Sequence, residues 1–182
     1  MEIKPLKLLG TYEINCTPRY DERGYFVRAY DEAVFREYGL TTSWVQENQS
    51  LSTRKGVIRG FHFQKPPYTE TKLRRVVLGS VLEVFVDLRL SSKTYGHWDA
   101  IELSDENKKL VYIPKGFATA ICTLTEQALV IYKVDAPYNA KSEGGLRWND
   151  ESLGINWPID NPYLSTKDAS WEDMINFHSP FA

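Results

Sequence analysis

The sequence predicts an all-β protein of the sandwich, barrel or jelly-roll type. Short alternating or apolar runs recur between residues 43 and 138, and turn-forming stretches such as KPPYTET, SSKTYG and SDENKK separate them. Only one segment in the first two-thirds of the chain has convincing helical spacing. Many short strands with almost no helix between them are typical of these all-β architectures. At 182 residues the chain is expected to form one domain, residues 1–182, with N- and C-terminal extensions.

The first elements are a turn and a helix. DERG, within TPRYDERGYF, has the composition of a turn. In the following DEAVFREYGL, the apolar residues Val34, Phe35 and Tyr38 recur at helical spacing. Acidic residues begin this segment and Gly39 follows it, so a helix is expected within residues 31–40.

Strand patterns follow the predicted helix. They are SWVQEN, GVIRGFHFQ, TKLRRVVLG, SVLEVFVDLRL, GHWDAIEL, KLVYIPKGFATAICTL and ALVIYKVDAPY. The tail STKDASWEDMINFHSPFA is expected to be partly helical over residues 171–177.

Composition excludes several classes of protein. A net charge of −2, a pI near 6.0 and the lack of any basic run argue against a nucleic-acid-binding protein. No apolar run approaches membrane-spanning length, and the start MEIKPLKLLGTYEI has no signal-peptide pattern, so a cytoplasmic protein is expected. Cys16 and Cys122 have neither disulfide nor metal-site spacing and are expected to be reduced and buried.

The segment VIRGFHFQ contains two residues that an ordinary buried strand does not need. His62 lies between two phenylalanines and is either a core histidine bonded to a backbone carbonyl or a general base in a partly dry cavity. Strict alternation would place Arg59 on the opposite face from His62. A β-bulge at Gly60 would allow both side chains to enter the same cavity.

The other histidines do not indicate a metal site. A metal-dependent jelly roll usually has two His one residue apart, then a carboxylate and a third His, and that pattern is missing. No protein-held metal is therefore expected. His97 and His178 are expected at the surface.

Further polar residues each have two interpretations. Lys72, Arg74 and Arg75 either protect a strand edge from pairing or face a diphosphate. Tyr132 either is structural, as most strand tyrosines are, or faces a histidine across a cavity. Asp168 either caps the short tail helix or orients an imidazole.

Taken in order, the motifs resemble the dTDP-4-dehydrorhamnose 3,5-epimerase family, the metal-free cupins of deoxysugar biosynthesis. They are DERGYF, VQENQS, VIRGFHFQ, KLRRVVLGSVLEVFVDLR, SSKTYGHW, LSDENKKLVYIPKGFA, YKVDAPY, WNDESLGINWP and LSTKDA, between about residues 20 and 169. The resemblance implies a cupin double-stranded β-helix (jelly roll) that acts as a homodimer without a cofactor. It also implies inversion of C3, C5 or both in a nucleotide-diphospho-4-keto-6-deoxysugar, in deoxysugar and surface-polysaccharide biosynthesis.

The resemblance also assigns roles to individual residues. The catalytic base falls on His62, its carboxylate partner on Asp168, the general-acid tyrosine on Tyr132 and the lysine beside the substrate carbonyl on Lys72. The positions that hold the diphosphate or the base fall on six residues: Arg59, Arg23, Phe26, Gln46, Asn48 and Tyr138.

Three positions depart from the pattern of the family. Thr119, in GFATA, stands where the family usually has a second active-site histidine, and Glu83 stands where that histidine's aspartate partner is expected. Threonine cannot shuttle a proton near neutral pH, which favours epimerisation at one carbon only. Arg28 stands where the family commonly has a glutamate near the base. Because arginine only donates hydrogen bonds and cytosine offers acceptors, Arg28 leads to the hypothesis of a CDP-linked or other non-thymidine sugar. The alternative is that Arg28 points to solvent.

Two other functions use the same resemblance. A 3,4-ketoisomerase of related cupin fold would move the carbonyl instead of inverting a carbon. A degenerate relative would only bind nucleotide or sugar, but the base, acid and lysine positions are all retained.

Overall fold

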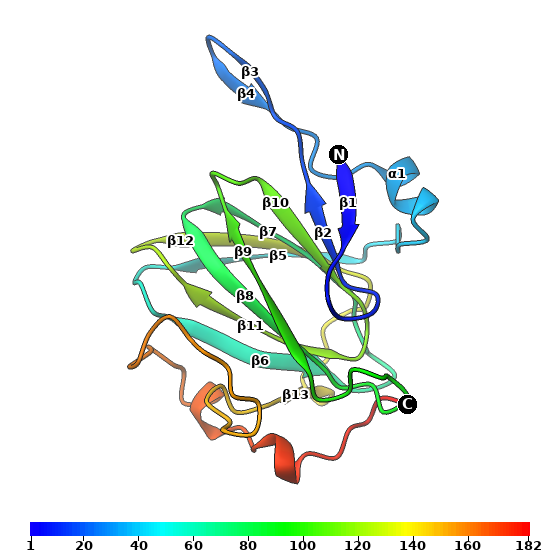
Figure 1. Ribbon diagram of the computed structural model, residues 1–182, viewed down its shortest axis with the longest axis vertical. Helices are drawn as coiled ribbons and strands as arrows, with labels where there is room; N and C mark the ends of the chain where they lie inside the picture. The colour runs from blue at the N-terminus through cyan, green and yellow to red at the C-terminus, as the bar shows by residue number, and fades with distance from the viewer.

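The computed structural model describes residues 1–182 and contains two antiparallel β-sheets that face each other (Figure 1). The six-stranded sheet has the order β1 (Glu2–Pro5), β2 (Tyr12–Asn15), β10 (Lys109–Ile113), β7 (Lys72–Leu78), β12 (Ala128–Val134) and β5 (Gln46–Ser52). The five-stranded sheet has the order β13 (Glu143–Gly145), β6 (Ile58–Gln64), β11 (Phe117–Thr123), β8 (Ser80–Asp87) and β9 (Trp98–Ser104). This arrangement is the jelly roll of the cupin fold, as predicted.

The space between the sheets is apolar at one end. Val76 and Val130 of the six-stranded sheet pack with Val81, Phe85 and Ile101 of the five-stranded sheet in a buried cluster. Burying such side chains stabilises the fold by about 1.5–3 kcal/mol each. The cluster therefore joins the two sheets and leaves the remaining interior for polar groups.

Each sheet is also covered on its outer face. Helix α1 (Glu32–Glu37) covers the six-stranded sheet, where Phe35 packs with Leu73 and Leu110. The C-terminal segment runs along the outer face of the five-stranded sheet (Figure 1), where Phe181 packs with Phe63. Where these segments cover a sheet, its outward side chains are apolar, and the inward side chains of the same strands are free to be polar.

Most of the predicted elements are confirmed. Helix α1 begins after Asp31, whose side chain caps it, and ends before Gly39, which has a φ of +68°. The longest predicted strand segment divides into β10 and β11, because Pro114 interrupts it. Strands β1, β2 and β13 were not among the predicted elements. The tail is helical only in two short 3₁₀ turns, η1 (Asp168–Ser170) and η2 (Met174–Asn176).

Strand β6 contains the predicted irregularity at Gly60. His62 is paired with Thr119 of β11 and Arg59 with Ile121, so β6 has one residue more than β11 over this interval. Gly60 has a φ of +131°, and a Cβ there would lie 2.6 Å from the backbone of Ala120. Only glycine fits this close approach. The bulge allows Arg59 and His62 to reach the same cavity.

A small hairpin, β3 (Arg19–Asp21) and β4 (Gly24–Phe26), projects from the body of the molecule (Figure 1). Its turn is the DERG segment, as predicted. Tyr20, Tyr25 and Phe26 are exposed on it. Lys108 lies over the ring of Tyr25, but all three rings remain largely accessible to solvent.

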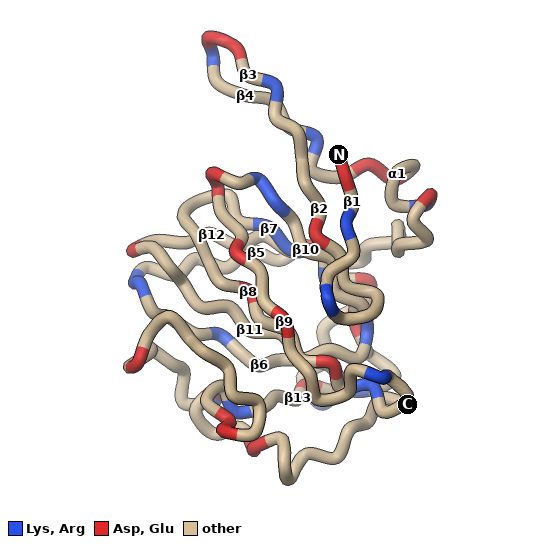
Figure 2. The backbone as a smooth tube through the Cα atoms, in the orientation of Figure 1, with Lys and Arg blue, Asp and Glu red and all other residues tan.

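Other surface features agree with the sequence. Acidic and basic residues are interspersed along the chain (Figure 2). His97 and His178 are exposed, and Cys16 and Cys122 are free and buried, as predicted. None of the helices has both the length and the apolar character needed to span a membrane.

Candidate active site

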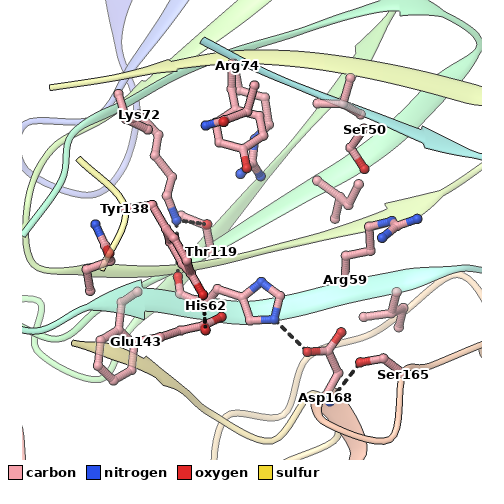
Figure 3. Close-up of a pocket in the computed structure, with 18 of the residues that line it drawn as sticks. Ser50, Arg59, His62, Lys72, Arg74, Thr119, Tyr138, Glu143, Ser165 and Asp168 are labelled. Carbon is pink, nitrogen blue, oxygen red and sulfur yellow. Dashed lines mark hydrogen bonds and ion pairs between the residues drawn. The ribbon is translucent and has the colours of Figure 1, made fainter. Parts of the chain in front are cut away.

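A cavity of about 570 Å³ opens between the two sheets. Strands β5, β7 and β12 form one wall, and β6 and β11 form the opposite wall. The loop that leads into η1 closes one side (Figure 3). The volume lies in the range of small-molecule sites, and most of the polar side chains that the sequence singled out line it.

His62 and Asp168 form a hydrogen bond in this cavity. His62 Nε2 lies 2.6 Å from Asp168 Oδ1, and the other ring nitrogen is turned toward the cavity (Figure 3). Burial alone would raise the pKa of Asp168, but the bond to His62 outweighs it and holds the pKa below its ordinary 3.8. The side chain of Asp168 does not cap η1, so the capping interpretation is wrong. The imidazole is oriented by a carboxylate.

Lys72 is buried in the same cavity. Its Nζ donates hydrogen bonds to Thr119 Oγ1 at 2.9 Å and to the carbonyl of His62 at 3.3 Å, and Glu70 lies 3.3 Å away. Burial lowers the pKa of Lys72, and the negative charge of Glu70 opposes this effect. The ammonium group is therefore held next to the backbone of His62 by fixed partners.

Tyr132 comes from β12, on the wall opposite His62. The guanidinium of Arg74 lies over its ring, 4.9 Å from the centroid. Arg74 in turn donates from Nη1 to both carboxylate oxygens of Glu83, at 2.5 and 2.6 Å. Burial would lower the pKa of Arg74, but the negative charge of Glu83 outweighs burial and raises this pKa. Glu83 of β8 thus pairs with an arginine of the opposite sheet.

Strand β7 is an interior strand, between β10 and β12. The interpretation of its basic residues as edge protection is therefore wrong. Lys72 and Arg74 are two residues apart, so both face the cavity, while Arg75 points the other way.

Further polar groups lie around the cavity. Arg59 donates to Ser52 Oγ and to the carbonyl of Leu51. Glu143 accepts hydrogen bonds from Tyr138 at 3.0 Å and from Lys167 at 2.5 Å. The bond to Glu143 raises the pKa of Tyr138.

The structure brings most of the predicted site residues together. Nine of them line the cavity: His62, Asp168, Tyr132, Lys72, Arg59, Gln46, Asn48, Tyr138 and Thr119. Three do not. Arg23 and Phe26 lie on the projecting hairpin, where Arg23 pairs with Asp21. Arg28 is bound to Asp31, the residue that caps α1, at 3.0 Å.

Several cavity residues were not among the predicted site residues. They are Ser50, Glu70, Arg74, Glu143, Ser165 and Lys167, of which only Arg74 had been considered, as one of three basic residues that either protect a strand edge or face a diphosphate. Alternation could have identified two of them, because Ser50 follows Asn48 and Arg74 follows Lys72 at a spacing of two. Glu143 and Lys167 come from β13 and a loop, and no local pattern marks them. No three His, Cys, Asp or Glu side chains converge on one point.

A jelly roll that holds an oriented imidazole, a buried ammonium group and a facing tyrosine around one cavity defines a cupin-fold isomerase. The arrangement offers a base, a cation for a developing oxyanion and a second proton donor. Comparison with known proteins gives the family. The family model for dTDP-4-dehydrorhamnose 3,5-epimerase matches residues 5–176, and the chain belongs to this family.

Individual relatives agree with this assignment. The chain is 44% identical to the dTDP-4-dehydrorhamnose 3,5-epimerase of Shigella flexneri over 157 residues, 86% of each protein. It is 36% identical to the dTDP-4-dehydrorhamnose 3-epimerase of Streptomyces niveus over 169 residues, 92% of this chain and 81% of that one. The crystal structure of the 3,5-epimerase of Bacillus anthracis with TDP and PPi bound is similar, with a TM-score of 0.93 and 39% identity over 95% of this chain and 99% of that one.

Proposed function

We propose that the protein is an epimerase of a dTDP-linked 4-keto-6-deoxyhexose, acting by removal and return of a proton next to the keto group. The observation that carries the proposal is the His62–Asp168 pair, which lies across one cavity from Tyr132 and beside Lys72. The names of the relatives supply the substrate class. The 4-keto group acidifies the hydrogens on C3 and C5, because the resulting carbanion is delocalised as an enolate.

His62 is the proposed base. Its cavity-facing nitrogen accepts the proton from carbon, while Asp168 stabilises the imidazolium that forms. Lys72 provides the positive charge for the enolate oxygen. Buried, fixed donors of this kind are effective because they need no reorganisation when charge develops.

Tyr132 is the proposed proton donor on the opposite face. A proton removed from one side of the carbon and returned from the other inverts the configuration. Tyr132 lies on the wall opposite His62, which is the arrangement that inversion requires. General acid–base catalysis of this kind contributes about 10²–10⁴-fold to the rate.

Arg59 is the proposed diphosphate ligand. The other cationic side chains that line the cavity have carboxylate partners: Lys72 has Glu70, Arg74 has Glu83 and Lys167 has Glu143. Arg59 has only a hydroxyl and a carbonyl as partners, so its charge is free to meet a phosphate.

The test is proton exchange in heavy water. The wild-type protein should incorporate deuterium into a dTDP-4-keto-6-deoxyhexose and yield an inverted sugar by NMR. His62→Asn should reduce exchange to a small residual rate, and unchanged exchange would require another base. A product with a moved carbonyl would instead identify a ketoisomerase.

Epimerisation at one carbon is a second part of the proposal. Thr119 is bonded to Lys72, and Glu83 is already paired with Arg74, so neither is available as a second base. In the heavy-water experiment, one of C3 and C5 should exchange much faster than the other. Exchange at similar rates would contradict this part and leave the epimerase proposal intact.

The nucleotide is tested separately. Arg28 is engaged by Asp31, which supports no preference for cytosine within this chain. Calorimetry with dTDP and CDP should therefore show tighter binding of dTDP. Tighter binding of CDP would revive the non-thymidine hypothesis.

A homodimer explains the hairpin residues. Arg23 and Phe26 lie outside the cavity of their own chain, on a projecting hairpin with exposed aromatic rings. We propose that the hairpin completes the cavity of a second copy. Mixing an inactive His62→Asn protein with an inactive Arg23→Ala/Phe26→Ala protein, after reversible dissociation, should restore activity. No restoration, or a monomer by analytical ultracentrifugation, would contradict this part.

A further inference from the structure

We propose that Arg74 is a sugar-binding residue that determines specificity, donating hydrogen bonds to a hydroxyl or carbonyl oxygen of the hexose. The inference rests on the proposed function and extends it. Arg74 has no role as base, acid or diphosphate ligand in the proposed function, and the inference assigns it a contact with the sugar.

The position of Arg74 favours contact with the sugar. It lies in the interior of the cavity, opposite His62 (Figure 3), with 9% of its side chain exposed against 35% for His62. Its guanidinium is stacked over the ring of Tyr132. A group that Arg74 contacts is therefore close to the carbon that Tyr132 protonates, so that group belongs to the hexose rather than to the nucleotide.

The hydrogen bonding of Arg74 leaves donors free. A guanidinium has five N–H groups, and only Nη1 has a partner, the carboxylate of Glu83. Nε is buried without a partner. Nη2 has no partner either, so an oxygen in the cavity that accepts from Nη2 satisfies a donor that is otherwise unpaired.

The charge of Arg74 limits the kind of group that it binds. Glu83 is completely buried and accepts both bonds from Nη1, so the pair has no net charge. A carboxylate or phosphate at this point would be placed close to the Glu83 carboxylate. A hydroxyl or carbonyl oxygen accepts from the free N–H groups without that repulsion. The pair is thus suited to a neutral sugar.

The alternative is that the pair only fills space between β7 and β8. Buried ion pairs are often replaceable by apolar residues without loss of stability, whereas removing one partner leaves a costly lone charge. Two variants are therefore needed. Arg74→Lys keeps the cation beside Glu83 and loses the forked donors. Arg74→Met/Glu83→Leu removes both charges together.

The experiment compares the binding of dTDP with that of a dTDP-6-deoxyhexose by calorimetry. Both variants should bind dTDP within about twofold of wild type and the sugar nucleotide about tenfold more weakly, the factor expected for one lost hydrogen bond to a charged group. An analogue of the sugar nucleotide that lacks the contacted oxygen should bind wild type more weakly than the parent sugar nucleotide does. The double variant should bind the analogue and the parent with equal affinity.

Two results would overturn the inference. One is that both variants bind the sugar nucleotide as tightly as wild type does. The other is that wild type binds dTDP and the sugar nucleotide equally. Because these are binding measurements, they are separate from proton exchange, whose absence in wild type would refute the epimerase proposal instead.

Discussion

Replacing Asp168 by asparagine should slow deuterium exchange about 10- to 100-fold and leave the affinity for the nucleotide sugar nearly unchanged. Asp168 accepts a 2.6 Å hydrogen bond from His62 and is buried. Asparagine keeps the shape and a neutral acceptor but loses the negative charge that stabilises the imidazolium. Hydrogen bonds to charged groups contribute about 1.5–3 kcal/mol. Each 1.36 kcal/mol is tenfold in rate, which gives the expected range.

The assay is the initial rate of deuterium entry into C3 and C5, followed by NMR, with calorimetry for affinity. The matched control is the His62→Asn/Asp168→Asn double variant. If Asp168 acts only through the imidazole, the double variant should be no slower than His62→Asn alone. Full activity of Asp168→Asn, or a double variant much slower than His62→Asn, would refute the reasoning.

Three further predictions concern catalysis and folding. Lys72→Met should lower the exchange rate about 10²-fold or more. Because burial lowers the pKa of Lys72, the activity of the wild-type protein should decline at a lower pH than the ordinary lysine pKa of 10.5 would imply. Gly60→Ala should lower the free energy of unfolding by about 3 kcal/mol or more, because the new Cβ would meet Ala120. The control is Gly24→Ala, at φ +127° with open space around it, which should lower the free energy of unfolding by about 1 kcal/mol. Equal urea midpoints for the two variants would contradict this prediction. Asp150 accepts hydrogen bonds from backbone N–H groups and from the hydroxyl of Ser152. Burial would raise the pKa of Asp150, but these bonds outweigh burial and hold the pKa below 3.8. The contribution of Asp150 to the free energy of unfolding is therefore present above pH 3.8 and is lost as the pH falls through the folded-state pKa. Wild type should therefore lose more stability than Asp150→Asn between pH 6 and pH 3, and parallel losses would count against it.

Local sequence patterns predicted much of the framework. The strands β6, β7, β8 and β12 are long, apolar and bounded by turn residues, and helix α1 has both a cap and a glycine stop. The short strands β1, β2 and β13 have no such pattern, because their pairing with neighbouring strands, and not their own composition, makes them strands. The tail was expected to be more helical than it is, since packing against the five-stranded sheet determines its course.

The site was predicted unevenly for the same reason. The family resemblance assigned His62 and Asp168 to one pair, although they are 106 residues apart. It also assigned Arg23, Phe26 and Arg28, which lie away from the cavity in this chain. The placement of a hairpin relative to a cavity depends on how distant segments pack.

By itself, the sequence indicated which strand residues are polar and named Gly60 as a position where the ladder could bulge. Those properties depend on the two-residue alternation of a strand and on the backbone freedom of Gly60, both of which are local. Only the tertiary structure decided which partners the charged groups take. Glu83 binds Arg74, Lys72 binds Thr119, and Glu143 meets Lys167 at the edge of the cavity. Ion pairs and hydrogen bonds need contact within a few ångströms, and the folding of remote segments against one another sets those distances.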